Sequence, residues 1–124
     1  MFTAEKGKGA RLNGVLIKVS GRTYPQCMVE FDGLWAYDRP GVRRNFEAIA
    51  SKFHRHFRLF GSLIHSSLSV ASGDTDGHLG FLGKPWDFAP GILLVTEAGG
   101  IATDFKGSKA TTSTRNTILS AIVP

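Results

Sequence analysis

The stretch WDFAPGILLVTEAGG, Trp86–Gly100, decides the fold prediction for this chain of 124 residues. Asp87 has the short carboxylate of a helix N-cap, which accepts hydrogen bonds from the unpaired N–H groups of the first turn. Pro90 then falls at the third helical position, where a missing N–H costs nothing. Four consecutive aliphatic residues, Ile92–Val95, leave the helix without a polar face, and Gly99 supplies a left-handed stop. The pattern predicts a buried helix that holds Asp87 at its positive end.

Segments with strand and helix patterns alternate on both sides of this stretch. The predicted strands span 27–32, 57–60, 78–82, 101–105 and 117–123. Two further helices are predicted, one with Val42, Phe46, Ile49, Ala50 and Phe53 on its apolar face, the other over 62–72 with Ile64, Leu68 and Ala71 inward. Such alternation is typical of an α/β fold, a layered and mostly parallel sheet with flanking helices.

The first twenty residues have a different pattern. Two short strand-like runs surround the glycine-rich turn Gly7–Gly9, and the dipeptide Asn13-Gly14 is a strong signal for a two-residue turn. The sequence therefore predicts an N-terminal β-hairpin over 1–20 ahead of the α/β part.

Two more motifs accompany the Trp86–Gly100 stretch: FTAEKGKGARLNGVLIKVS, Phe2–Ser20, and RLFGSLIHSSLSVASGDTDG, Arg58–Gly77. Together the three resemble the second half of the inositol monophosphatase family, magnesium-dependent and lithium-sensitive sugar phosphatases that include enzymes for inositol phosphate and fructose bisphosphate. The resemblance implies a phosphomonoesterase that uses Mg²⁺ and acts on a sugar phosphate, with Asp87 as a metal ligand.

The resemblance also implies which residues line the substrate side. Gly61, Ser62 and Leu63 match the turn that holds the sugar in the family. Independently of the resemblance, Lys84, just ahead of Pro85-Trp86, is a candidate for attracting the phosphate. Related phosphatases often carry a carboxylate for the ring hydroxyls at the position of Gly80, which has no side chain here. Simpler interpretations remain open, because Asp87 and Ser62 are both good helix caps and an exposed lysine is usually only solvated.

The first half of the family pattern is absent from the sequence. These phosphatases build their metal cluster mainly from an upstream glutamate and an Asp-Pro-x-Asp-Gly-Thr loop, which does not occur in these 124 residues. A two-metal site needs several carboxylates around cations about 3.5–4 Å apart, and Mg²⁺ requires nearly octahedral oxygen ligation. The chain is therefore expected to contain no complete catalytic site and to be inactive alone.

This expectation divides the chain into a hairpin, residues 1–20, that belongs to a missing N-terminal antiparallel sheet, and a C-terminal α/β domain, residues 21–124. The exposed edges and apolar face of such a hairpin favour a homo-oligomer or a partner that supplies the N-terminal half. Two alternatives follow: a half-enzyme that works only with a separate N-terminal partner, or a noncatalytic binding or assembly module.

Composition argues against several other classes of protein. The net charge is +5, but the basic residues form no stripe with interleaved aromatics, so nucleic acid is not an expected partner. The single Cys27 cannot form an internal disulfide. The absence of a leader pattern and of an apolar run near the roughly 18 residues that span a bilayer predicts no membrane association and a cytoplasmic location.

Overall fold

The computed structural model describes residues 1–52 and 56–120. In chain order the elements are β1 (Phe2–Ala4), β2 (Ala10–Leu12), β3 (Val15–Leu16), β4 (Val29–Asp32), the 3-10 helix η1 (Leu34–Ala36), α1 (Pro40–Ala50), β5 (Phe57–Leu59), α2 (Leu63–Ser72), β6 (Gly77–Gly80), α3 (Pro85–Glu97), β7 (Ile101–Thr103) and β8 (Thr117–Ser120). Residues 121–123 of the last predicted strand lie outside the described residues.

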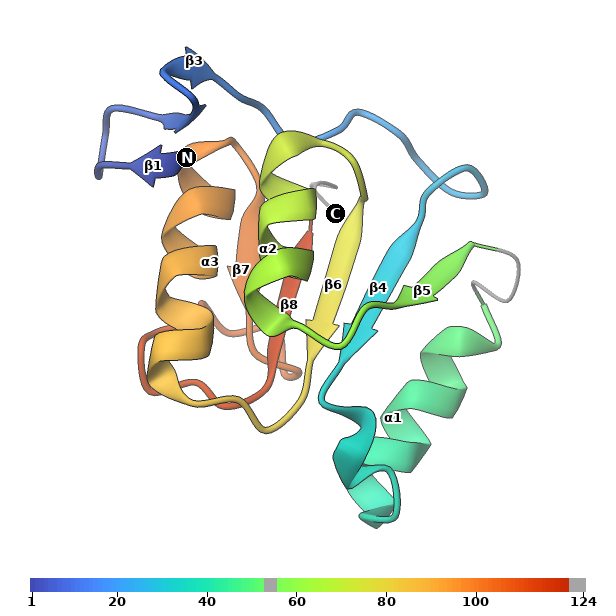
Figure 1. Cartoon of the computed structure of the whole chain (residues 1–124). Coiled ribbons are helices and arrows are strands. Elements are labelled where there is room, and N and C mark those ends of the chain that lie inside the picture. The colour runs from blue at the N-terminus through green and yellow to red at the C-terminus, as the bar shows by residue number, and fades with distance from the viewer. Residues whose placement is uncertain (53–55, 121–124) are drawn as a thin grey trace.

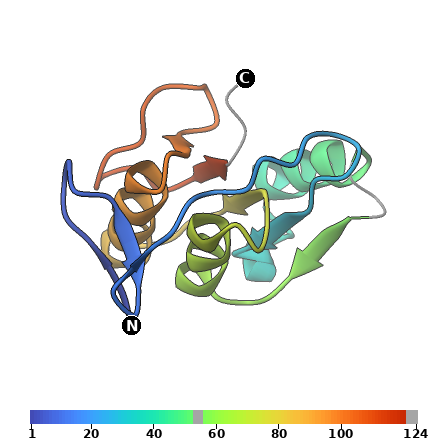
Figure 2. The ribbon, with the colours of Figure 1, turned by 90° about the horizontal axis from the view of Figure 1, so that it is seen from above.

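The main sheet has five strands in the order β5-β4-β6-β8-β7 (Figure 1). β4 pairs in parallel with β5 and β6, whereas β8 is antiparallel to both of its neighbours, so four of these five strands run in one direction. Helices α2 and α3 cover one face of the sheet and α1 covers the other, as the view from above shows (Figure 2). The prediction of a layered, mostly parallel α/β fold is confirmed.

Both faces of β4 are buried, because a helix covers each side. Val29 and Phe31 point toward α1, where the rings of Phe31 and Phe46 meet edge to face with centroids 5.0 Å apart. Glu30 and Asp32 point toward α2 on the opposite face and are 1% and 2% exposed. The strand prediction is confirmed, and the acidic residues that alternate with its apolar ones lie inside the molecule.

The amphipathic helix predicted around Val42 is α1. The apolar side chains of Val42, Phe46, Ile49 and Ala50 pack into the core beneath it, and Phe53 lies outside the described residues. The helix predicted over 62–72 is α2, capped by Ser62 and stopped by Gly73, whose φ is +82°. Ile64 was expected to face inward, which is wrong: it is 43% exposed, in the first turn of α2, where it borders a surface pocket.

Helix α3 begins earlier than the sequence indicates. Its N-cap is Lys84 and its first helical residue is Pro85, whose fixed φ suits that position. Asp87 is consequently the third helical residue rather than the cap, and Pro90 lies in the helix interior. The helix is also not buried on every side, since Trp86 and Leu93 are 69% and 36% exposed.

The predicted N-terminal hairpin is present, as a separate antiparallel sheet in the order β1-β2-β3. Asn13 and Gly14 form the turn between β2 and β3 with φ of +50° and +84°, as expected for this dipeptide. The sheet is attached to the end of α3: the N–H groups of Gly7 and Gly9 each donate to the carboxylate of Glu97 at 2.9 Å. These two donors hold the pKa of Glu97 below its usual value.

None of the helices in the described part of the chain is long and apolar enough to span a membrane.

Candidate functional site

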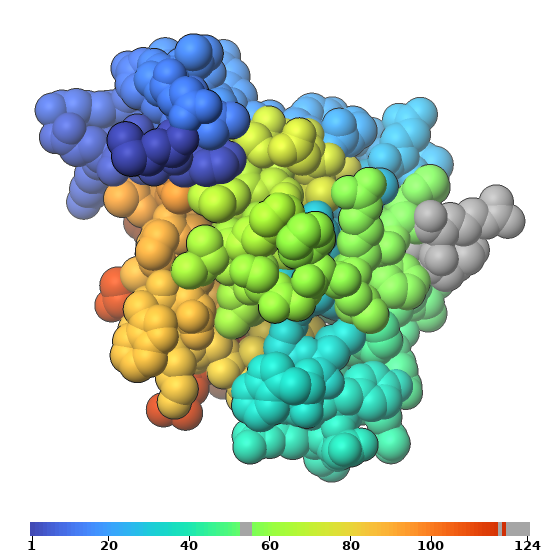
Figure 3. Space-filling model, viewed as in Figure 1, coloured from blue at the N-terminus to red at the C-terminus, as the bar shows by residue number. Residues whose placement is uncertain are grey.

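The carboxyl ends of β4 and β5 meet the N-termini of α2 and α3 at one edge of the main sheet (Figure 1). Figure 3 shows the segments that follow β4 (cyan), precede α2 (green) and open α3 (yellow-orange) near one another on this face. A pocket of about 300 Å³ lies there, lined by Asp32, Gly33, Trp35, Gly61, Ser62, Leu63, Ile64 and Asp87. Open α/β sheets commonly bind ligands outside the carboxyl ends of their strands.

Four of the five residues predicted for the site, Gly61, Ser62, Leu63 and Asp87, line this one pocket. They come from two segments that the fold brings together, the turn before α2 and the first turn of α3. The fifth, Lys84, does not line it but borders an adjoining pocket on the other side of Trp35. The predicted set is therefore largely, but not wholly, one cluster.

The turn at Gly61 and Ser62 is fixed by hydrogen bonds within the protein. Gly61 has φ of +85°, a left-handed conformation that favours glycine. Its N–H donates to Asp32 Oδ1 at 2.6 Å, and Ser62 Oγ accepts from the N–H of His65 at 3.3 Å. The Gly61 amide is thus already bonded to a carboxylate, which leaves Ser62 and Leu63 as the groups of the turn facing the pocket.

Asp87 is held by its own helix. Its Oδ2 accepts from the backbone N–H of Lys84 at 2.8 Å, while the N–H of Asp87 donates back to the Lys84 carbonyl at 2.9 Å. This reciprocal pair fixes the carboxylate at the positive end of the helix dipole. Among the described residues Oδ1 has no hydrogen-bond partner, so this oxygen is available to a ligand.

Asp32 is the functional candidate that the sequence analysis missed. Besides Gly61, its carboxylate accepts from the hydroxyl of Ser66, and its Oδ2 lies 3.2 Å from Nε2 of His78, without the alignment of a hydrogen bond. Burial opposes the ionisation of Asp32, but the interactions with His78, Ser66 and Gly61 outweigh it and lower the pKa. The sequence does contain a signal for Asp32: strands of a parallel sheet are usually covered on both faces, so an acidic residue within such a strand is expected to be buried.

Glu30 lies on the same face of β4, two residues before Asp32, but its carboxylate has fewer hydrogen-bond partners. Its Oε2 has no hydrogen-bond partner among the described residues, and its side chain is buried. Burial raises the pKa of Glu30, an effect that the hydroxyl of Ser66 and the neighbouring His78 only partly offset. Glu30 therefore favours its neutral form far more than Asp32 does.

The residues present do not make a complete magnesium site. Asp32 and Asp87 are the two carboxylates of the pocket, and both oxygens of Asp32 already accept from the protein. No group of three or more His, Cys, Asp or Glu side chains in residues 1–52 and 56–120 is arranged to hold a metal ion. Mg²⁺ needs nearly octahedral oxygen ligation, of which Asp87 offers a single protein ligand.

Gly80 and Leu63 are complementary in shape. A Cβ added at Gly80 would lie 2.6 Å from Phe88 Cε1 and 2.8 Å from Leu63 Cδ2. Leu63 and Phe88 thus occupy the space that a side chain at position 80 would need, and a carboxylate at this position does not fit the packed structure.

The comparisons with known proteins agree on one family. The model of the inositol monophosphatase family matches residues 1–122. The fructose-1,6-bisphosphatase/inositol-1-monophosphatase of Thermotoga maritima is 35% identical over 117 residues, which cover 94% of this chain and 44% of that protein. The Nus factor SuhB of Escherichia coli K12 is 35% identical over 109 residues, covering 86% of this chain and 41% of that protein.

Solved structures support the same relationship. The extragenic suppressor protein suhB of Bartonella henselae superimposes with a TM-score of 0.84 at 32% identity, covering 96% of this chain and 46% of that one. The chain thus spans less than half the length of the relatives it matches.

Proposed function

The chain belongs to the inositol monophosphatase family, and we propose that it is the C-terminal part of a magnesium-dependent phosphatase that hydrolyses sugar phosphomonoesters. Residues 1–20 would complete an antiparallel sheet supplied by an N-terminal half, and residues 21–124 would form the C-terminal α/β domain. The coverage of 44% of the Thermotoga maritima relative supports this division.

The observation that carries the proposal is the shared pocket of Asp87 and the turn 61–63 at the edge of the sheet. In the proposed enzyme Asp87 is one ligand of Mg²⁺, through the oxygen that Lys84 does not engage. Ser62 and Leu63 border the sugar, and the Gly61 amide holds the turn in place through Asp32. Lys84 attracts the phosphate from the neighbouring pocket.

We expect the chain to release no phosphate by itself, because one free carboxylate oxygen cannot hold two cations. The test incubates the purified chain with Mg²⁺ and either inositol 1-phosphate or fructose 1,6-bisphosphate and measures inorganic phosphate. Release at the background rate is expected. Ordinary turnover by the chain alone would overturn the proposal.

Reconstitution tests the role of Asp87. The chain is co-expressed with the N-terminal half of the Thermotoga maritima relative, and phosphate release by the purified complex is measured. If activity appears, Asp87→Asn should lower it at least a hundredfold, because a metal ligand is lost. Asp74→Asn removes an exposed carboxylate elsewhere and should change it less than twofold. Equal losses in the two variants would remove Asp87 from the proposed site.

Large exposed side chains favour a version of the proposal in which the chain works only in an assembly. Trp35, Phe60 and Trp86, next to the pocket or lining it, are 75%, 55% and 69% exposed. Exposed apolar groups of this size are typical of surfaces that another chain covers. A second copy of the chain or a separate N-terminal half could cover this surface. A tagged chain should therefore retain an N-terminal half in a pull-down.

A second candidate, a noncatalytic assembly module, is favoured by the incomplete set of metal donors in the described residues. In that case the chain should bind a partner while neither partner nor complex releases phosphate in the assay above.

A further inference from the structure

The turn 61–63 is attached at both of its ends to polar side chains in the interior of the protein. At its first residue, the N–H of Gly61 donates to Oδ1 of Asp32, in β4, at 2.6 Å. At its last residue, the carbonyl of Leu63 accepts from the hydroxyl of Ser67, in α2, at 2.7 Å. The turn that borders the sugar in the proposed function therefore has two separate anchors, on two different elements.

His78, in β6, lies between these two anchors. Its Nδ1 is 3.4 Å from Ser67 Oγ, and its Nε2 is 3.2 Å from Asp32 Oδ2, without the alignment of a hydrogen bond. Three elements can build this arrangement because α2 covers the face of the sheet on which β4 and β6 are neighbours (Figures 1 and 2). The contacts close a ring beneath the turn, which consists of Gly61, Asp32, His78, Ser67 and Leu63.

The side chains of this ring are shielded from water. Ser67 and His78 are fully buried, and Asp32 is 2% exposed. A buried hydroxyl or imidazole is costly unless it is hydrogen-bonded or paired, which favours these contacts over any alternative orientation. Burial opposes the ionisation of Asp32, but its interactions, first with His78 and then with Ser66 and Gly61, lower its pKa. The imidazole therefore stabilises the form of Asp32 that accepts from the turn.

Aspartate, histidine and serine side chains in this order also occur in hydrolytic triads. In such a triad the serine hydroxyl donates to the histidine and must reach a substrate. Here the hydroxyl of Ser67 donates to the Leu63 carbonyl, and the side chain has no exposed surface. The geometry therefore favours a role in holding the turn over a role in covalent chemistry.

We propose that His78 and Ser67 are positioning residues, which hold the turn 61–63 in the shape that the sugar phosphate meets. They act through Asp32 at one end of the turn and through Leu63 at the other. The sugar phosphate as ligand comes from the proposed function, on which this role rests, whereas the fixed shape of the turn can be measured on the chain alone.

Hydrogen exchange of the Gly61 amide, followed by NMR without Mg²⁺ or substrate, measures how firmly the turn is held. Ser67→Ala should accelerate this exchange at least tenfold, because the Leu63 carbonyl and the imidazole of His78 both lose the hydroxyl. The amides of β6 are the internal reference. A general loss of stability would accelerate them as much as Gly61, whereas loss of the anchor accelerates Gly61 alone.

Ser69→Ala is the matched control for Ser67→Ala. Ser69 is also buried in α2, and its hydroxyl also donates to the carbonyl four residues earlier, that of His65, at 3.2 Å. Among the described residues this hydroxyl contacts no member of the ring. The control should leave the exchange of Gly61 within twofold of the parent.

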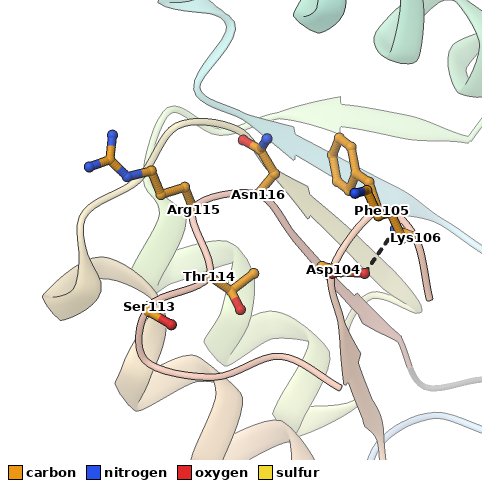
Figure 4. Close-up of a pocket in the computed structure, with 7 residues that line it drawn as sticks. All are labelled: Asp104, Phe105, Lys106, Ser113, Thr114, Arg115 and Asn116. Carbon is orange, nitrogen blue, oxygen red and sulfur yellow. Dashed lines mark hydrogen bonds between the residues drawn. The ribbon is translucent and has the colours of Figure 1, made fainter. Parts of the chain in front are cut away.

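Asp32→Asn and Asp104→Asn form a second matched pair. Both carboxylates accept backbone N–H groups: Asp32 from Gly61, and Asp104 from Lys106 at 2.8 Å, the dashed line in Figure 4, and from Ser108 at 2.9 Å. Asp104 follows β7, which is at the opposite edge of the main sheet from β5 and the turn. Asp32→Asn should accelerate the exchange of Gly61 at least tenfold, and Asp104→Asn should change it less than twofold.

His78→Phe tests the link through the imidazole. Phenylalanine fills a similar space but has no ring nitrogen, so the exchange of Gly61 should again be faster than that of β6, at least fivefold. An unchanged Gly61 in both His78→Phe and Ser67→Ala would overturn the positioning role. Equal acceleration of Gly61 and the β6 amides would overturn it as well.

The reconstituted complex distinguishes positioning from chemistry. Ser67→Ala should raise KM for the sugar phosphate at least fivefold and change kcat less than twofold, because the turn borders the sugar. A lower kcat with an unchanged KM would overturn the positioning role. An inactive complex would overturn the proposed function, while the exchange of Gly61 would still decide the role of His78 and Ser67.

Discussion

Two carboxylates on the same face of β4 have opposite electrostatic roles. Asp32 accepts from the N–H of Gly61 and the hydroxyl of Ser66 and lies beside His78, whereas Glu30 retains an oxygen without a partner among the described residues. A buried charge is stabilised only where it is hydrogen-bonded or paired. Although both carboxylates are almost completely buried, the ionised form of Asp32 should stabilise the fold, and the ionised form of Glu30 should destabilise it.

Asp32→Asn should destabilise the protein at neutral pH. The pKa of Asp32 is lowered in the folded state, so its ionised form contributes stability above the usual pKa, and this contribution is lost as the pH falls through the folded value. We expect a loss of about 1–3 kcal/mol at pH 7, typical of a broken buried network. Urea unfolding of both proteins at several pH values should show the difference shrinking below about pH 4. A difference that is constant with pH would contradict this role of the charge.

Glu30→Gln should have the opposite effect. The pKa of Glu30 is raised by burial, so its ionised form costs stability above the folded value, and the cost disappears as the pH falls and the side chain takes up a proton. The variant should gain about 1 kcal/mol at pH 8, because a neutral amide replaces a buried charge. The gain should vanish in acid, where the parent is also neutral. Glu5→Gln, at an exposed position, is the control and should stay within about 0.5 kcal/mol of the parent.

At the scale of elements, the contact between β6 and α3 depends on a glycine. Gly80→Ala would place a Cβ 2.6 Å from the ring of Phe88, and this overlap should cost about 1–3 kcal/mol. Gly41→Ala, in the first turn of α1, meets no atom within 4 Å and should instead gain up to about 1 kcal/mol. Thermal melting measures both changes. Similar melting temperatures for the two variants would show that β6 and α3 move apart easily.

The elements were largely predictable because their local signals agree with the tertiary structure. Gly73 and Gly99 stop α2 and α3 with φ of +82° and +89°, and Asn13-Gly14 forms the expected turn. The start of α3 was misjudged because Asp87 satisfies two capping patterns equally well from sequence, as an N-cap or as a third residue bonded back to the N-cap. Only the preceding Pro85, which favours the first helical position, distinguishes them.

The candidate site was predictable only where a known motif marked it. Asp87 and the turn 61–63 lie within the motifs that resemble the family, and the structure brings them into one pocket. Asp32 lies outside those motifs, and its role depends on Ser66 and His78, which are 34 and 46 residues away in sequence. Contacts of this kind arise from the packing of α2 and β6 on β4, which no local pattern encodes.

At the scale of the whole molecule, the N-terminal sheet is anchored on one side and has an exposed edge strand on the other. Its inner side is fixed to α3 through Glu97 and through Ala10, which is fully buried. Its outer edge is β3, where Val15 and Leu16 are 69% and 58% exposed. In Figure 3 this sheet (blue) stands out from one corner of the molecule. An exposed edge strand with apolar side chains is a template for pairing with another chain.

We therefore expect the purified chain to self-associate through β3 when no partner covers it. Sedimentation velocity at tens of micromolar should show species larger than the 13.4 kDa monomer. Val15→Lys places a charge on the edge and should shift the distribution toward the monomer, because burial of an ammonium group in a strand pair is costly. Thr112→Lys adds the same charge at an exposed position in a distant loop and should leave the distribution unchanged. A monomeric parent, or equal shifts in both variants, would show that association does not occur through this edge and that the exposed aromatic residues around the Asp87 pocket are the surface to test next.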